Sequence, residues 1–144
     1  MRLLKFAVII FFTSSLCYCS TPYKRGDWLD GWMGGFVNTR IDANTAIISF
    51  RGNYFTSPKQ AQNYAMYRAA EITINAGYNY FIVTNATELP PDNRFNHYYQ
   101  IPCPQKNAHT SVIAIKMFQG NVPYSLPNAY DAKEIITHLG SIIY

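Results

Sequence analysis

The sequence is poor in charged residues and in cysteine. Charged residues make up 14% of the 144 residues, compared with about 25% in an average soluble domain. The positive residues are scattered, and part of the formal charge of +4 comes from Arg2 and Lys5 near the N-terminus. Because no basic stripe is present, the sequence argues against a nucleic-acid-binding protein. We therefore expect no nucleic-acid partner.

Metal, cofactor and catalytic motifs are also missing. The cysteines and histidines do not have the spacing of a zinc site, and no carboxylates complete one. These residues are Cys17, Cys19, Cys103, His97, His109 and His138. We predict no metal, no cofactor and no enzymatic activity.

An enzymatic alternative stays open. His97 or His109 could act as a general base, and its acidic partner would be Asp92 or Glu88. Cys103, which follows His97 by six residues, could supply a nucleophile. Prolines on both sides of Cys103 favour a rigid loop thiol instead, and nearness in sequence is not aligned geometry. A Cys/His hydrolase is therefore the less favoured interpretation.

The N-terminus has the pattern of an export signal. Arg2 and Lys5 precede the apolar run FAVIIFF, and TSSLCYC follows. A membrane-spanning helix needs about 20 apolar residues, so we predict a signal peptide over residues 1–18. Two kinds of processing are open: lipid attachment at Cys19, or cleavage before Ser20, where small residues stand at the positions that signal peptidase prefers.

A tether is expected over residues 19–35. This stretch mixes proline, glycine and charge with two tryptophans, and it has no period. Trp28 and Trp32 either pin the tether to the domain or stay exposed for a partner. Packing is favoured, because isolated tryptophans usually bury most of their area.

The predicted domain begins with a hairpin. FVNTRI at residues 36–41 alternates weakly and precedes DANT, which has turn chemistry. AIISF at residues 46–50 predicts a buried strand. Arg51, Gly52 and Asn53 follow it and predict a turn, because glycine and asparagine tolerate positive φ.

A helix is expected to begin at Pro58. Ser57 can cap it, and Gln60 can complete a capping box. Small residues then form a smooth stripe at helical spacing: Ala61, Ala65, Ala69, Ile72 and Ala76. Gly77 is expected to end the helix, and the strand YNYFIVT follows. A strand, helix and strand in one sheet predict parallel strands.

Arg68 and Glu71 lie three positions apart on this helix and can pair. The simplest interpretation is an ion pair at the helix rim. A sharper alternative places Arg68 under the turn at residues 51–53, where it would bind carbonyl groups, or beside a ligand. For Arg51, Gly52, Asn53, Arg68 and Glu71 we therefore expect a structural role.

The second half of the chain starts with a long irregular loop. Residues 88–106 contain four prolines and no period, which indicates a segment that is either mobile or functional. Tyr98 and Tyr99 in this loop, like Trp28 and Trp32, are candidate contact residues, because exposed aromatic side chains stack on sugars and partner surfaces.

A strand and a helix complete the predicted domain. Residues 110–118 alternate and predict a strand. Asp131 and Glu134 predict a helix start, and Gly140 its end. The apolar face of this helix would be formed by Ile135, Ile136 and Leu139. We predict one α+β domain over residues 36–144, with a small mixed sheet of about four strands and two helices packed on it.

Four short motifs together resemble a known family. The chain has CSTPY from Cys19, RGN from Arg51, RAAE from Arg68 and AYDA from Ala129. In this combination it resembles a family of small Gram-negative envelope lipoproteins of unknown function. The resemblance implies that Cys19 is lipidated and that the protein is anchored in the cell envelope, in the periplasm or at the outer membrane. It implies no catalytic residues.

We therefore expect a non-enzymatic envelope lipoprotein with a periplasm-facing binding or scaffolding domain. Its expected partners are a membrane, through the lipid anchor, and envelope proteins or glycans. Cleavage before Ser20 would instead produce a secreted soluble factor, which is the main alternative.

Overall fold

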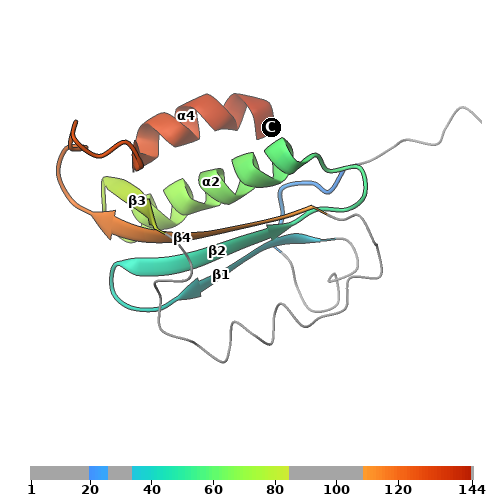
Figure 1. Cartoon of the computed structure of the whole chain (residues 1–144), viewed down its shortest axis with the longest axis horizontal. Coiled ribbons are helices and arrows are strands. Elements are labelled where there is room, and N and C mark those ends of the chain that lie inside the picture. The colour runs from blue at the N-terminus through green and yellow to red at the C-terminus, as the bar shows by residue number, and fades with distance from the viewer. Residues whose placement is uncertain (1–19, 26–33, 85–108, 144) are drawn as a thin grey trace, which may run out of the picture.

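The computed structural model describes residues 20–25, 34–84 and 109–143, and within these it has five strands and two helices (Figure 1). In chain order they are β1 (Gly35–Arg40), β2 (Thr45–Arg51), α2 (Pro58–Asn75), β3 (Tyr80–Thr84), β4 (Thr110–Phe118), β5 (Ala129–Asp131) and α4 (Ala132–Ile143). The strands form one sheet in the order β1-β2-β4-β3-β5. Helix α2 covers one face of this sheet, and α4 packs against α2 on the same side. The predicted α+β class is confirmed.

The sheet is antiparallel throughout, so the prediction of a mixed sheet is wrong. Strand β4 lies between β2 and β3 and pairs antiparallel with both. β2 and β3 therefore run in the same direction, as expected for strands joined by a helix, but they are not neighbours. The fifth strand, β5, was not predicted; it has only three residues and pairs with the outer edge of β3.

The predicted hairpin is confirmed as β1 and β2, which pair from Gly35 opposite Arg51 to Arg40 opposite Ala46. Its turn is closed by Asp42, whose Oδ1 accepts a hydrogen bond from the Asn44 backbone N–H at 2.9 Å. This bond stabilises the carboxylate and lowers the pKa of Asp42.

Helix α2 starts at the predicted residue with the predicted Ser57 cap, but Gln60 does not complete a capping box, because its side chain donates to Ser20 Oγ and the Tyr64 hydroxyl instead. It begins at Pro58, and the Gln60 N–H donates to Ser57 Oγ at 3.1 Å. The small-residue stripe faces the sheet, where Ala61, Ala65 and Ala69 are buried in the core. The strands contribute large apolar side chains to the same core: Ile48, Phe50, Phe81, Ile115 and Met117. Gly77 has a φ of 82°, which lets the chain leave the helix in a left-handed turn.

The C-terminal helix is longer than predicted. Asp131 Oδ1 accepts from the Glu134 N–H at 3.0 Å, which confirms the predicted cap. The helix does not end at Gly140, however, but continues to Ile143. Gly140 has no positive φ, and a Cβ there would make an ordinary contact of 3.8 Å with Tyr67 Cε2 on α2, so the helix can pass through this position.

Candidate interaction site

Part of the stretch expected to be a tether packs against the domain. The Phe36 N–H donates to the Lys24 carbonyl at 2.8 Å, and Arg25 forms a parallel bridge with Phe36. Thr21 is only 1% exposed. The folded unit therefore includes residues 20–25, ahead of the predicted domain start at residue 36.

The loop between β2 and α2 holds Thr21 from two sides. The Thr21 backbone N–H donates to Thr56 Oγ1 at 3.1 Å, and the Thr21 hydroxyl accepts from the Asn53 backbone N–H at 2.7 Å. The Thr56 hydroxyl in turn donates to Asn53 Oδ1 at 3.0 Å. Because both threonines are 1% exposed, these bonds satisfy groups that water does not reach.

Close packing explains the glycines at this junction. A Cβ on Gly52 would lie 2.4 Å from the Cβ of Thr56, and a Cβ on Gly34 would lie 2.3 Å from the Arg51 carbonyl oxygen. The predicted turn at residues 51–53 is present, but the predicted reason is wrong. Neither Gly52 nor Asn53 has a positive φ, and Gly52 is required because no side chain fits there.

Tyr23 is held by a second group of side chains, which includes Glu71, Arg68 and Phe36. Its hydroxyl donates to Glu71 Oε2, the same oxygen that pairs with Arg68 Nη1 at 2.9 Å. Its ring packs against Phe36 and meets Tyr67 edge-on, with centroids 4.9 and 5.2 Å apart. Burial, and then the hydrogen bond to the Glu71 carboxylate, raise the pKa of Tyr23. The ion pair predicted between Arg68 and Glu71 is therefore present, and it also binds the N-terminal segment.

Arg68 does not bind the carbonyl groups of residues 51–53, so that alternative is wrong. Its guanidinium donates instead to Asn38 Oδ1, from Nε at 3.3 Å and from Nη2 at 3.1 Å. The guanidinium carbon also lies 4.4 Å from the centroid of the Phe36 ring. Arg68 thus joins α2 to the edge strand β1 and, through Glu71, to Tyr23.

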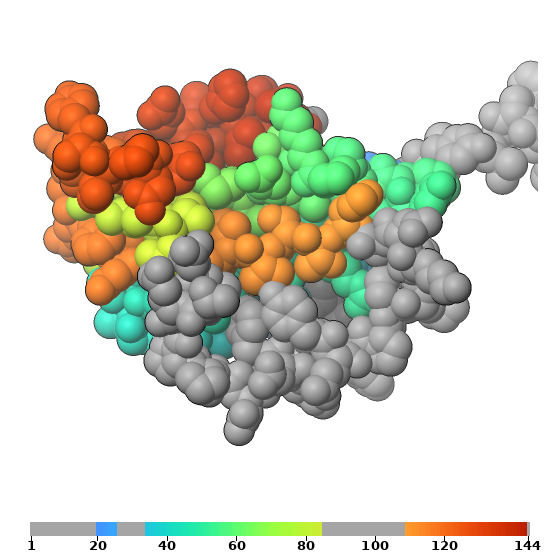
Figure 2. Space-filling view, in the orientation of Figure 1, coloured from blue at the N-terminus to red at the C-terminus, as the bar shows by residue number. Residues whose placement is uncertain are grey.

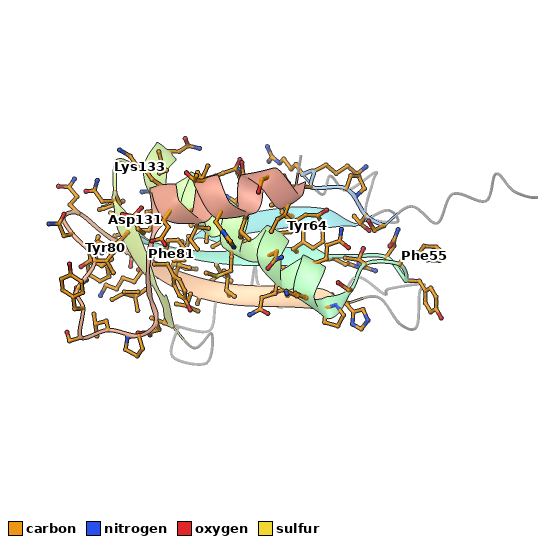
Figure 3. All side chains as sticks on the ribbon, turned by 90° about the horizontal axis from the view of Figure 1, so that it is seen from above. Phe55, Tyr64, Tyr80, Phe81, Asp131 and Lys133 are labelled. Carbon is orange, nitrogen blue, oxygen red and sulfur yellow. The ribbon has the colours of Figure 1, made fainter. Side chains whose placement is uncertain are left out.

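The loop that binds Thr21 also carries two exposed aromatic side chains. Tyr54 is 61% and Phe55 45% exposed, and their rings meet edge-on with centroids 5.4 Å apart. The Phe55 N–H donates to Asn53 Oδ1 at 3.0 Å, which fixes the backbone of the loop. Figure 3 shows Phe55 pointing away from the body of the domain at one end. Two adjacent large aromatic residues beside a predicted turn are the sequence signal for this pair, and the predictions from the sequence do not include it.

All of the predicted contact residues, the predicted lipidation site and most of the predicted catalytic residues lie outside the described residues. They are Cys19, Trp28, Trp32, Tyr98, Tyr99, Glu88, Asp92, His97 and Cys103. Of the residues that are described, His109 and His138 are both exposed, on separate elements. The acidic partners predicted for His109 are among the residues outside the described ranges, so the catalytic pairing stays a prediction.

Metal-binding clusters and membrane-spanning helices are absent from the part of the chain that the structure describes. Among its residues, no group of three or more His, Cys, Asp or Glu side chains is placed to hold a metal ion. Neither of its helices combines the length and apolarity that crossing a membrane requires.

Comparison with known proteins adds no relative. No family model matches the sequence, and neither the curated proteins nor the solved structures contain a significant match. The family resemblance seen in the short motifs therefore stays a prediction.

Proposed function

We propose that this protein is a non-enzymatic envelope lipoprotein, anchored through Cys19, whose domain binds or scaffolds a partner in the periplasm. The observation that carries the proposal is the docking of Thr21 and Tyr23. An acyl anchor on Cys19 would be separated from the buried Thr21 by Ser20 alone, so the anchor would be joined almost directly to the folded domain.

Such an anchor would orient the domain on the membrane. Ser20 Oγ accepts from Gln60 Nε2 at 3.3 Å, which places Ser20 beside the first turn of α2. The Gly120 N–H donates to Asn79 Oδ1 at 3.0 Å, which places the β4–β5 loop at the other end of that helix. A helix of 18 residues is about 27 Å long at 1.5 Å per residue.

The end remote from Ser20 is the better candidate surface for a periplasmic partner. It carries Tyr124 and Leu126 in the β4–β5 loop, which are 109% and 39% exposed. In Figure 2 the orange atoms of this loop and the green atoms of residues 52–57 lie at opposite ends of the molecule. Exposed aromatic and leucine side chains at such a position suit contact with a protein or glycan surface.

Cell fractionation with intact-mass analysis tests the anchor. The expected species is membrane-bound, starts at Cys19 and is heavier by a diacylglyceryl group with an added acyl chain, and Cys19→Ala should abolish both the added mass and the membrane association. A soluble species that starts at Ser20 would contradict the anchor and favour the secreted factor.

Crosslinking in intact cells tests the partner surface. A photoreactive residue at Tyr124 should give discrete adducts with envelope components, whereas one at Gln62, an exposed residue near the start of α2 and therefore at the opposite end, serves as the control. Identical adduct patterns at the two positions would contradict a binding role for the β4–β5 loop.

A further inference from the structure

We infer that Tyr54 and Phe55 insert into the headgroup layer of the same membrane that holds Cys19, so that the domain rests on the lipid surface in one orientation. This inference rests on the proposed acylation of Cys19 and deepens it: the anchor would have two parts, a lipid and an aromatic loop.

The position of the loop follows from the hydrogen bonds of Thr21. Both groups that bind Thr21 belong to Asn53 and Thr56, which flank Tyr54 and Phe55 directly. In the sequence, Ser20 alone separates Cys19 from Thr21, and consecutive Cα atoms are about 3.8 Å apart. An acyl chain on Cys19 would therefore be attached within two residues of the threonine that this loop binds.

The chemistry of the loop suits the interface between lipid and water. Tyrosine places an apolar ring in the acyl region and a hydroxyl among the headgroups, and such residues concentrate at this level of a membrane. Tyr54 and Phe55 are large, exposed and held in an edge-on pair. Asn53 Oδ1 accepts from both the Phe55 N–H and the Thr56 hydroxyl, so the loop is preorganised and little entropy is lost on insertion.

The charge distribution favours the same orientation. Arg51 and Lys59 flank the loop, at the end of β2 and in the first turn of α2. Of the four carboxylate residues that the structure describes, Glu71 lies within α2 and is paired with Arg68. The other three lie at the opposite end of the sheet: Asp42, Asp131 and Glu134. Arg40, Lys116 and Lys133 lie at that same end and balance these three carboxylates. Anionic headgroups would therefore attract the end that carries Tyr54 more strongly than the other.

Depth-dependent fluorescence quenching tests the inference on the full mature protein. The protein is purified from membranes, its mass is measured, and it is placed in vesicles of phosphatidylethanolamine and phosphatidylglycerol. An environment-sensitive fluorophore is attached at Lys59→Cys or, at the far end, at Ser125→Cys, each combined with Cys103→Ser. Lipids that carry a nitroxide near the headgroup act as quenchers.

The expected result is quenching several-fold stronger at position 59 than at position 125. Tyr54→Ser with Phe55→Ser should reduce the signal at 59 to the level seen at 125, whereas Tyr54→Trp with Phe55→Trp should retain it. A control on the exposed side of α4, Lys133→Ser with Thr137→Ser, should leave the quenching at positions 59 and 125 unchanged. Equal thermal midpoints for these variants establish that the fold is intact.

The lipid anchor and the insertion of the aromatic loop can be overturned separately. An acylated protein whose quenching at position 59 is the same with and without the aromatic pair would overturn the inference and leave the lipid anchor standing. A mature mass without acyl groups would overturn the proposed anchor and the inference together.

Discussion

The hydroxyl of Tyr23 donates a hydrogen bond to the carboxylate of Glu71, 48 positions later in the chain. This bond ties the N-terminal segment to the middle of α2. It is reinforced because the same carboxylate oxygen pairs with Arg68, which also reaches β1 through Asn38. Three separate parts of the sequence thus depend on one carboxylate.

Replacing Tyr23 by Phe tests the strength of this bond. The ring contacts remain while the hydroxyl is lost, so the free energy of unfolding should fall by about 1.5 to 3 kcal/mol, the usual range for a hydrogen bond to a charged partner. Denaturant titration measures the change. Tyr124→Phe makes the same chemical change at a fully exposed ring and should have no effect; equal stability of both variants would contradict the role of the hydroxyl.

The same residue predicts a pH dependence. Burial and the bond to Glu71 raise the pKa of Tyr23 above its ordinary value of 10.0. The folded protein therefore holds this proton more tightly than the unfolded chain does, so the contribution to stability is complete below about pH 10 and is lost as the pH rises above it. Between about pH 8 and pH 11, the wild-type protein should lose more stability than Tyr23→Phe. Parallel pH profiles would disprove the assignment.

Arg68 should not tolerate replacement by either methionine or lysine. Arg68→Met removes the ion pair, both bonds to Asn38 and the contact over Phe36, and it should cost about 1 to 2 kcal/mol. Arg68→Lys keeps the charge beside Glu71 but not the planar fork, so an intermediate loss is expected. Lys133→Met, at an exposed position on α4, is the control. If Arg68→Met melted like this control, the cluster would have no structural role.

Two glycine substitutions should have opposite effects. Gly52→Ala places a Cβ 2.4 Å from the Cβ of Thr56 and should destabilise the protein by about 2 to 3 kcal/mol through overpacking. Gly140→Ala meets only ordinary contact with Tyr67 at 3.8 Å. Inside a helix it should stabilise by about 0.5 to 1 kcal/mol. Thermal unfolding of both variants measures these changes in stability. A stabilising Gly52→Ala would be incompatible with the described packing.

Thr56→Val tests the docking of the N-terminal segment. Valine has the shape of threonine but leaves the buried Thr21 N–H without its acceptor, which should cost about 1 to 3 kcal/mol. Hydrogen exchange of the Thr21 amide should accelerate, and Thr56→Ser should restore most of the protection because it keeps the hydroxyl. Thr137→Val, on the exposed side of α4, is the control. Unchanged exchange in Thr56→Val would show that the segment is held by other contacts.

Local signals in the sequence were sufficient for the main elements. Ser57, Gln60 and Gly77 mark the limits of α2 because capping and left-handed turns depend on residues only a few positions apart. The same reasoning located the hairpin, the cap at Asp131 and strand β4. The predicted end of α4 was wrong because Gly140 does not adopt the left-handed conformation that stops a helix, and α4 continues to Ile143.

Long-range contacts were not accessible in this way. The bonds from Arg68 to Asn38 span 30 positions, and no spacing rule connects an arginine on a helix to an amide on an edge strand. In the sequence, Thr21 lies in a polar, proline-containing stretch typical of a linker. Its burial depends on Asn53 and Thr56, which are more than 30 positions away, so no local pattern predicts it. Strand order likewise depends on pairing between distant segments, so β4 could not be placed between β2 and β3 from periodicity alone.

The central position of β4 has a consequence for the order in which the protein can fold. Strands β2 and β3 have no hydrogen bonds to one another and are both completed by β4. A chain that crosses a membrane N-terminus first would therefore emerge with Ile48, Phe50 and Phe81 available but without the strand that joins them. Cooperative folding would begin only after residue 118 has been delivered, and until then the nascent chain would depend on chaperones to remain unaggregated.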